Sequence, residues 1–384
     1  MSGDRTIRVA VDLRCLDDPR PRGFGRYATA LLDSLAEHEP SVELIGFATR
    51  FGSGHRAACP FPTGSELVAE QWRFPRAATQ RGAHVIWCPA NRGLPLLSPL
   101  PTVLTLHDAV EWDRSMVPRP SGRSGLRFAY SSAASIASAA AIITPSATAA
   151  GEVVRRLHVD PALVHVVHEG AAPCFAPVEG PRDAEVLAQL GVARPYLLYV
   201  GGFDDKKDVG TLLEAAHALT TPLVLVGDLE RRTEALRQAA PPTARWLGRV
   251  DDSSLAVLYR HAVAFAFPAL AEGFGLPPVE AMASGAPVVV ARTGSLPEVV
   301  ADGGVLVEPR SPLALAAALR SLLNDPRHRD RMVAAALRRA SQLSWAAAAH
   351  STAAVLRDVA AVKTAQMIAR RARSSPAAFR AAVL

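Results

Sequence analysis

The sequence lacks several features that would place it in common protein classes. It has four cysteines, Cys15, Cys59, Cys88 and Cys174. They are scattered and form no Cys-x-x-Cys pair, so we expect neither a zinc site nor a disulfide framework but a reduced, cytosolic chain. The longest stretch without a charged residue, 128–151, is rich in Ser, Thr and Ala and contains Pro145, so it does not have the character of a membrane-spanning helix. A strand-like run opens the chain, and no signal segment is expected.

Several catalytic signatures are also absent. The sequence has no P-loop, no Gly-x-Ser-x-Gly elbow and no His-Glu-x-x-His pair. It has no Asp-x-Asp triplet, so a divalent metal that clamps a diphosphate is not expected. No dense stripe of basic and aromatic residues occurs, so we expect no nucleic-acid partner despite the net charge of +6.

The residues that are present indicate two α/β domains. With 384 residues the chain is too long for one ordinary domain, and 49% hydrophobic content allows a sizeable core. Among 42 basic residues only Lys206, Lys207 and Lys363 are lysines, which suggests a GC-rich genome. Two of these three lysines are adjacent, and this marks their position as a candidate site.

Short apolar runs alternate with helical stretches in both halves, which predicts parallel sheets covered by helices on both faces. In the first half we expect strands at residues 8–13, 42–47, 84–88, 102–106 and 141–144, and a helix at 26–36. In the second half we expect strands at 196–200, 223–226, 263–267, 287–291 and 304–307, and helices at 210–219, 253–260, 278–284, 312–324 and from 345 past 358.

The predicted fold is therefore α/β, with two doubly wound, Rossmann-like domains that face a cleft. The segment 173–183 is rich in Pro and typical of a linker. We predict a first domain over residues 1–175, a linker over 176–194, a second domain over 195–345 and a helical C-terminal part over 346–384.

The segment 272–285, EGFGLPPVEAMASG, contains the strongest candidate site. Its two prolines suit the first turn of a helix, where free amides favour a phosphate, and Gly275 lets the backbone approach a ligand. Glu272 in the loop and Glu280, expected in the first turn, would repel a phosphate, so they fit better as acceptors for sugar hydroxyls beside it. The alternative is that Glu280 only complements the helix dipole and that Glu272 is a solvated loop residue.

A second candidate site directly follows the predicted strand at 196–200. The run 201–208, GGFDDKKD, places glycines, two lysines and a helix after a buried strand, an arrangement that holds a diphosphate. Lys206 and Lys207 are its candidate cations. The alternative is a solvated turn in which the lysines pair with the neighbouring aspartates.

Two further motifs lie in the first half. Gly23 and Gly25 match Gly-x-Gly-x-x-Ala but lie too far beyond the first strand for a dinucleotide site, so we interpret them as a glycine-rich loop facing the cleft, or else a surface turn. His107 follows the strand at 102–106 and would face the same cleft, where Asp108 could hold its ring or bind a hydroxyl. The alternative is a structural histidine.

Together these motifs resemble the retaining glycosyltransferase family 4, which has the GT-B fold. The run 246–309 matches the family's donor domain almost without gaps, and Glu272 and Glu280 correspond to its Glu-x7-Glu pair. The first half resembles its acceptor domain through residues 11–14, 23–27, 107–108 and 143–146. The resemblance implies that the last helix packs back on the first domain.

The resemblance also implies roles for the matching positions. The donor-binding residues would be Gly23, Gly25, Gly201, Lys206, Lys207, Val250, Phe274, Gly275, Leu276 and Glu280, and the catalytic residues His107, Asp108 and Glu272. Within this set, Lys207 and the amides of Gly275 and Leu276 would bind the diphosphate. Glu280 would hold the ribose, and the backbone near Val250 would touch the base.

The remaining roles concern the reacting sugar. Glu272 would bind the transferred sugar next to the anomeric carbon, and His107 would contact the sugar or the reacting centre from the other domain. Many family members carry arginine where this chain has Gly202, so Lys206 would supply the second cation.

The resemblance therefore implies a transferase that moves a hexose from a nucleotide diphosphate sugar, GDP- or UDP-linked, to an acceptor hydroxyl, without metal or further cofactor. A glycan of the cell envelope, lipid-linked or not, or a small secondary metabolite would be the acceptor, and the Gly-Gly turn favours a mannosyltransferase-like donor site. A nucleotide-sugar epimerase or hydrolase and a non-catalytic partner subunit stay open as alternatives. The basic segment 359–384 could bring a cytoplasmic protein to the inner face of the membrane, or it could pack back on the first domain. The basic segment 114–127 could meet a phosphorylated, lipid-linked or other acceptor, or only solvent.

Overall fold

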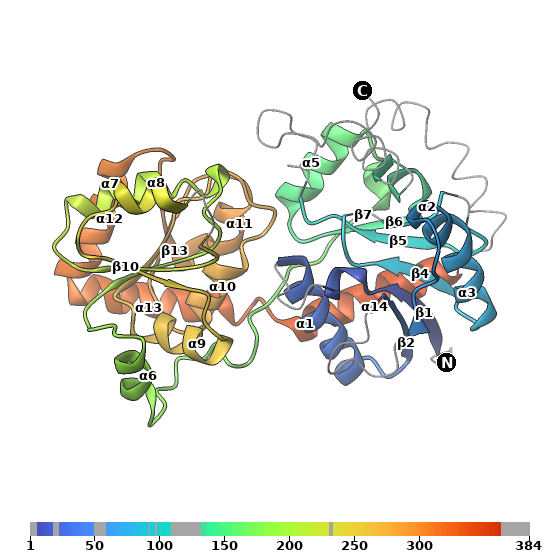
Figure 1. The fold of residues 1–384 in the computed structure, drawn as a ribbon, viewed down its shortest axis with the longest axis horizontal. Helices are drawn as coiled ribbons and strands as arrows, with labels where there is room; N and C mark the ends of the chain where they lie inside the picture. The colour runs from blue at the N-terminus through green and yellow to red at the C-terminus, as the bar shows by residue number, and fades with distance from the viewer. Residues whose placement is uncertain are drawn as a thin grey trace. The chain divides into compact units, whose positions relative to one another are not determined.

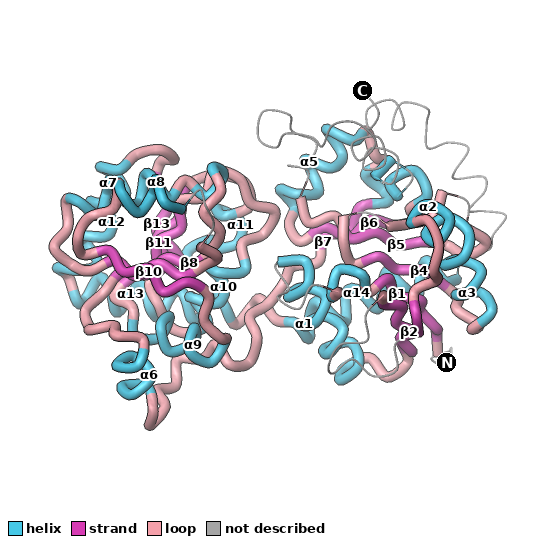
Figure 2. Tube along the Cα trace, in the orientation of Figure 1, coloured by secondary structure: helices cyan, strands magenta, loops and turns pink. Residues whose placement is uncertain are grey.

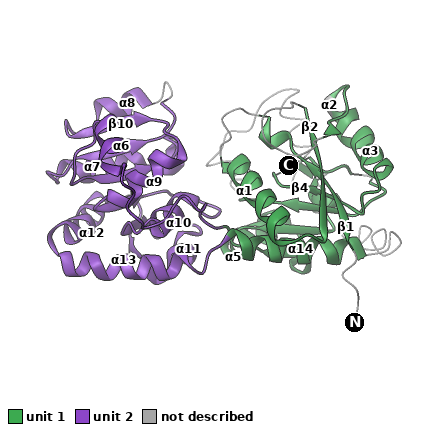
Figure 3. Cartoon of the chain, turned by 90° about the horizontal axis from the view of Figure 1, so that it is seen from below, with its two compact units in different colours: residues 1–169, 345–384 green, residues 170–344 purple. Residues whose placement is uncertain are grey.

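The computed structural model describes residues 6–17, 23–49, 59–91, 93–96, 98–108, 132–133, 135–229 and 233–361. The chain forms two compact units, and unit 1 is Met1–Glu169 with Trp345–Leu384 while unit 2 is Gly170–Ser344 (Figure 3). In the part of the chain that the structure describes, no helix is both long and apolar enough to cross a membrane. The segment 114–127 and the tail after residue 361 lie outside the described residues, so the acceptor contact of the first and the membrane contact of the second stay predictions.

Unit 1 is built on a parallel sheet of seven strands in the order β3-β2-β1-β4-β5-β6-β7 (Figure 1). The strands are β1 (Ile7–Asp12), β2 (Val42–Ala48), β3 (Cys59–Pro60), β4 (Val85–Cys88), β5 (Thr102–Thr105), β6 (Ala141–Thr144) and β7 (Val164–Val166). All residues of β4, β5 and β6 are buried, as expected for central parallel strands that are covered on both faces.

Helices cover both faces of this sheet (Figure 2). They are η1 (Arg14–Leu16), α1 (Gly23–His38), α2 (Glu66–Val68), η2 (Ala69–Arg73), α3 (Phe74–Gln80), α5 (Ala147–Leu157), η4 (Pro161–Leu163) and α14 (Trp345–Ala361). The last of these is held to unit 1 by Glu39, which lies 3.0 Å from Nδ1 of His350 and also pairs with Arg357. This confirms that the final described helix returns to the first domain.

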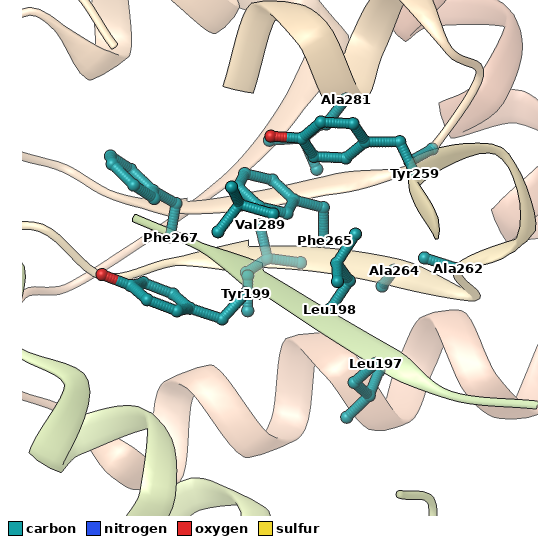
Figure 4. Packing of buried hydrophobic residues seen from close by; sticks show 14 of the residues in the cluster. Leu197, Leu198, Tyr199, Tyr259, Ala262, Ala264, Phe265, Phe267, Ala281 and Val289 are labelled. Carbon is teal, nitrogen blue, oxygen red and sulfur yellow. The ribbon is translucent and has the colours of Figure 1, made fainter. Parts of the chain in front are cut away.

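Unit 2 is built on a parallel sheet of six strands in the order β10-β9-β8-β11-β12-β13. The strands are β8 (Leu197–Val200), β9 (Leu223–Val226), β10 (Ala244–Gly248), β11 (Ala264–Phe267), β12 (Val288–Ala291) and β13 (Gly304–Val307). Figure 4 shows the aromatic core on its central strands, where the Tyr199 and Phe267 rings stack with centroids 6.1 Å apart and Phe265 lies 5.9 Å from Phe267.

The helices of unit 2 include one near the N-terminal end of this unit that the sequence analysis did not predict. They are α6 (Asp183–Gln189), η5 (Asp205–Lys207), α7 (Val209–His217), α8 (Thr233–Gln238), α9 (Asp252–His261), α10 (Leu276–Ala283), α11 (Leu296–Val300), η6 (Ala301–Gly303), α12 (Pro312–Asn324) and α13 (Pro326–Ala340). The predicted linker, 176–194, contains α6, whose Leu187 is buried in the core. The linker prediction is therefore wrong, because this segment is part of unit 2.

The strand orders locate the sites at which ligands bind in doubly wound sheets. In each sheet the order reverses once, between β1 and β4 in unit 1 and between β8 and β11 in unit 2. Loops that leave the carboxyl ends of the two strands at such a point diverge to opposite faces and open a crevice. Apart from Val250, which follows β10, the candidate residues of unit 2 follow β8 and β11, the two strands at its reversal point.

A buried ionic cluster joins α6 to α9. Oδ2 of Asp183 accepts a hydrogen bond from Nη1 of Arg260 at 2.5 Å and lies 2.9 Å from Nε2 of His261. Burial alone would raise the pKa of Asp183, but the hydrogen bonds from Arg260 and His261 hold that pKa below its ordinary value. This cluster fixes the segment that replaces the expected linker.

We predict that Asp183→Asn lowers the free energy of unfolding of unit 2 by about 3 kcal/mol, because Arg260 then keeps a largely buried charge without its counter-ion. Urea denaturation followed by circular dichroism measures this. The matched control is Glu179→Gln, which removes an exposed carboxylate 3.7 Å from His261 and should change the free energy by less than about 0.5 kcal/mol.

The contribution of the Asp183–Arg260 pair to stability has a defined pH dependence. Because the pKa of Asp183 is lowered in the folded state, its contribution is complete above the unfolded pKa of about 3.9 and is lost as the pH falls through the lower folded pKa. The stability difference between the parent chain and Asp183→Asn should therefore shrink below about pH 4. A difference that stayed constant down to pH 2 would contradict this account.

Candidate functional site

The turn after β8 and the loop after β11 are joined by their backbones. The N–H of Leu270 donates to the carbonyl oxygen of Lys206 at 2.7 Å. The turn itself is braced by Tyr199, whose hydroxyl donates to the carbonyl oxygen of Gly202 at 2.5 Å. Burial raises the pKa of Tyr199 well above its ordinary value, so this hydroxyl stays protonated and remains a donor. The two loops are thus held together by their backbones.

Lys207 and Glu272 meet where these loops adjoin. Nζ of Lys207 forms an ion pair with Oε1 of Glu272, and each side chain is only 15% exposed. The ammonium also lies 5.4 Å from the centroid of the Phe267 ring. Glu272 is therefore not the solvated loop residue of the alternative interpretation. The structure brings together the cation and the carboxylate that the sequence assigned to two separate motifs.

Ser295 fixes the shape of the Glu272 loop and was not predicted. Its hydroxyl lies 3.0 Å from the carbonyl oxygen of Glu272 and 2.8 Å from that of Phe274, and its N–H donates to the Glu272 carbonyl at 3.2 Å. A Cβ on Gly294 would lie 2.8 Å from that same oxygen, so this position needs glycine. The sequence signal that could have identified Ser295 was a Gly-Ser pair just after a predicted strand.

The helix α10 offers few free amides to a ligand. Gly275 precedes it with φ of 103°, and Pro277 and Pro278, which have no N–H, occupy its first turn. The first-turn N–H groups of a helix have no partner within it, so those of Gly275 and Leu276 remain for an anion. These are the two amides that the family resemblance selected.

Glu280 lies deeper than predicted. It is the fifth residue of α10, in the second turn rather than the first, and it is buried. The hydroxyl of Tyr259, on α9, donates to its Oε2 at 3.2 Å. Sequence reasoning gave no role to Tyr259, because nothing in its local pattern separates a core tyrosine from one that supports a carboxylate.

Val250 lies apart from these groups. It follows β10, the edge strand, which is separated from β8 by β9, and it is half-buried against the core. The structure therefore joins Gly201, Lys206, Lys207, Glu272, Phe274, Gly275 and Leu276 around one reversal point, with Glu280 one turn further along α10. Val250 packs against the same core as Phe274 and Leu276, and its predicted contact with the base stays a prediction.

In unit 1, His107 is enclosed by its own unit. Its backbone N–H donates to Oδ1 of Asn91 at 2.9 Å, its Nε2 lies 3.0 Å from the carbonyl oxygen of Pro89, and its Nδ1 lies 3.5 Å from Oε1 of Glu169. Because a carbonyl oxygen can only accept, Nε2 carries a proton. Both ring nitrogens therefore have partners, Pro89 and Glu169. The predicted role of Asp108, to hold the ring or to bind a hydroxyl, stays a prediction.

Aromatic rings complete the surroundings of His107. Phe24 stacks on the imidazole at 4.7 Å, and Tyr27 meets it edge-on at 4.5 Å. Both rings project from α1, which begins at Gly23, so Gly23 and Gly25 lie in the first turn of a helix rather than in the predicted glycine-rich loop. Glu169 lies three residues after the short strand β7, which we did not predict, and this is why its carboxylate was missed.

A second buried network lies at the carboxyl end of β1. Nη2 of Arg14 lies 2.5 Å from Oδ2 of Asp12 and 3.1 Å from Oε2 of Glu70, and both carboxylates are buried. Glu70 comes from η2, far away in the sequence. The network satisfies its own charges, so it shapes this edge of the sheet.

The donor-side residues offer a clear combination of chemistry. An ammonium and backbone amides suit a phosphate, and two carboxylates suit hydroxyl groups. Among the residues that the structure describes, no group of three or more His, Cys, Asp and Glu side chains is arranged to hold a metal ion.

Comparisons with known proteins assign the chain to a family. Residues 188–339 match the family described as glycosyl transferases group 1, and residues 21–173 match glycosyltransferase family 4. The chain is 31% identical to D-inositol 3-phosphate glycosyltransferase of Streptomyces scabiei over 84% of its length and 74% of the relative's. It is 32% identical to O-antigen chain mannosyltransferase B of Escherichia coli, a match over 55% of this chain and only 58% of that relative.

Solved structures show the same fold. Sucrose-phosphate synthase of Thermosynechococcus elongatus matches with a TM-score of 0.74 and 22% identity, over 92% of this chain and 99% of that one. Anabaena HepE in complex with UDP and glucose matches with a TM-score of 0.73 and 19% identity, over 92% and 100%. The predicted GT-B fold of two α/β units is thus confirmed. With each half matched by its own family description, the chain belongs to glycosyltransferase family 4 and is a glycosyltransferase.

Proposed function

We propose that this enzyme transfers a hexose from a nucleoside diphosphate sugar to an acceptor hydroxyl, with retention at the anomeric carbon and without a metal. The observation that carries the proposal is the meeting of Lys207, Glu272 and the start of α10 at the reversal point of unit 2. Cations and amides gathered there suit a diphosphate, and a carboxylate beside them suits a sugar. The relatives, among them a mannosyltransferase and an inositol phosphate glycosyltransferase, support this chemistry.

The residues divide the donor between them. Lys207, supported by Lys206 and by the amides of Gly275 and Leu276, binds the diphosphate and stabilises the negative charge that builds on it as the sugar leaves. Glu280 binds the ribose hydroxyls and Glu272 the sugar hydroxyls. Because these groups are fixed before the reaction, little reorganisation is needed when charge develops.

The relatives and the composition support a proposal for the donor, the acceptor and the location. A GDP- or UDP-linked hexose is the proposed donor, supported by the mannosyltransferase relative and by the UDP-bound structural neighbour. The proposed acceptor is a hydroxyl of a cell-envelope glycan, lipid-linked or not, or of a small metabolite. We place the enzyme in the cytoplasm, with possible peripheral contact with the membrane.

A panel of nucleotides tests the donor site first. We expect one of GDP, UDP, TDP and ADP to raise the melting temperature selectively, and EDTA or Mg²⁺ to leave that rise unchanged. At a concentration of about 100 Kd, binding to the native state adds about 2.7 kcal/mol of stability. A thermal-shift assay measures this. Absence of any shift would remove the support for a nucleotide site, and a shift abolished by EDTA would contradict the metal-free mechanism.

Loss of the ammonium should weaken nucleotide binding. We expect Lys207→Met to lower the affinity for the selected nucleotide about tenfold or more, because hydrogen bonds from a charged donor are lost, and to abolish turnover. Calorimetry and a coupled transferase assay measure the two effects, and circular dichroism checks the fold.

Product analysis without acceptor separates the transferase from the alternative functions, because an epimerase or a hydrolase would convert the donor fully when no acceptor is present.

Tyr259 should act through Glu280. Tyr259→Phe removes the hydroxyl that donates to this carboxylate, so we expect nucleotide affinity to fall about threefold to tenfold. The affinity penalty for a 2′,3′-dideoxy nucleotide should shrink in parallel, which a merely structural role would not cause. Tyr196→Phe is the control, since it deletes a buried hydroxyl that donates to Leu258 at 2.7 Å in the same unit. An unchanged penalty in Tyr259→Phe would contradict the role of Glu280 in ribose binding.

A further inference from the structure

The Lys207–Glu272 ion pair connects two groups that the proposed function assigns to different parts of the donor. In the proposed function Lys207 binds the diphosphate and Glu272 binds the sugar. In the structure the two side chains form an ion pair with each other. Both side chains are mostly withdrawn from solvent, so their attraction is screened less than that of a surface pair. A donor that uses both groups must first separate them.

The backbone around the pair keeps its two members close. The Lys206 carbonyl is bonded to Leu270 at 2.7 Å, and the Glu272 carbonyl is bonded to the Ser295 hydroxyl at 3.0 Å. With both loops fixed, exchange of partners requires only rotation of the two side chains. The separation therefore costs at least the energy of the ion pair, and the ligand must offset that cost.

Two ligands offset this cost to different extents. A nucleoside diphosphate takes the ammonium of Lys207 but offers nothing to Glu272, whose carboxylate is then left beside the negative diphosphate. An intact nucleotide sugar takes the ammonium in the same way and also presents hydroxyl donors to the carboxylate. Glu272 thus lowers the affinity for the nucleoside diphosphate and raises the affinity for the intact nucleotide sugar.

We propose that Glu272 is a specificity-determining residue that discriminates the intact nucleotide sugar from the nucleoside diphosphate through exchange of its ion pair with Lys207. This inference rests on the proposed function. After transfer the sugar hydroxyls have left, so Glu272 competes again for Lys207 and favours release of the nucleoside diphosphate. The exchange involves no covalent change beyond the transfer itself.

The test is Glu272→Gln, which keeps the side-chain shape and removes the charge. The ligands are the nucleoside diphosphate selected by the panel and its sugar conjugate with a fluorine at C2, which resists transfer. Calorimetry should show the diphosphate binding about threefold or more tighter and the sugar conjugate binding more weakly. Inhibition by the diphosphate product should become correspondingly stronger in any residual transfer activity.

Asp205→Asn is the matched control for charge. Asp205 is an exposed carboxylate in η5, two residues before Lys207, so its removal changes the local charge by the same amount. We expect Asp205→Asn to change both affinities less than twofold. An equal gain for Asp205→Asn and Glu272→Gln would overturn the inference in favour of general electrostatic repulsion.

A double-mutant cycle separates exchange from simple repulsion. In the Lys207→Met background there is no pair to break, so Glu272→Gln should improve diphosphate binding much less than it does in the parent chain. The same gain in both backgrounds, or weaker diphosphate binding by Glu272→Gln, would overturn the inference while leaving the proposed function intact. Diphosphate binding that is equally strong with and without Lys207 would instead overturn the proposed diphosphate role of Lys207.

Discussion

The donor side of this enzyme depends on one backbone hydrogen bond, from the N–H of Leu270 to the carbonyl oxygen of Lys206. Parallel strands β8 and β11 are neighbours, so their carboxyl ends emerge together, and this bond then holds the two outgoing loops in register. Lys207 and Glu272 lie one and two residues beyond the bonded atoms. Their pairing is therefore a consequence of sheet topology and loop anchoring, and it does not require long, flexible side chains to find each other.

Each carboxylate of the donor side has a dedicated support, and the supports differ in kind. Ser295 holds Glu272 through its backbone carbonyl, so the carboxylate can exchange Lys207 for a ligand. Glu280 is held at the carboxylate itself by Tyr259, within a helix, and has less freedom. A group that must change partners is thus fixed at its backbone, whereas a group that must keep its direction is fixed at its side chain.

The sequence predicted the fold because its elements are local, whereas the roles of the candidate donor-binding residues stay a proposal. The strands at 141–144, 223–226 and 304–307 and the helix at 312–324 have the predicted bounds, since each is an apolar or amphipathic run with clear ends. The supports Tyr259, Ser295 and Glu169 were missed because their roles arise only from contacts between distant segments. The segment 176–194 was misjudged because its prolines signal a linker, while the contacts of Asp183 and Leu187 with the rest of unit 2 are tertiary.

The enclosure of His107 changes what unit 1 can contribute to the reaction. With Pro89 and Glu169 at its ring nitrogens and Phe24 over its face, the imidazole is already held in one orientation. It serves well as a rigid support for the start of α1 and the end of β5. Leaving-group stabilisation at unit 2 therefore bears most of the proposed catalysis, which is consistent with a transfer driven by charge that develops on the diphosphate.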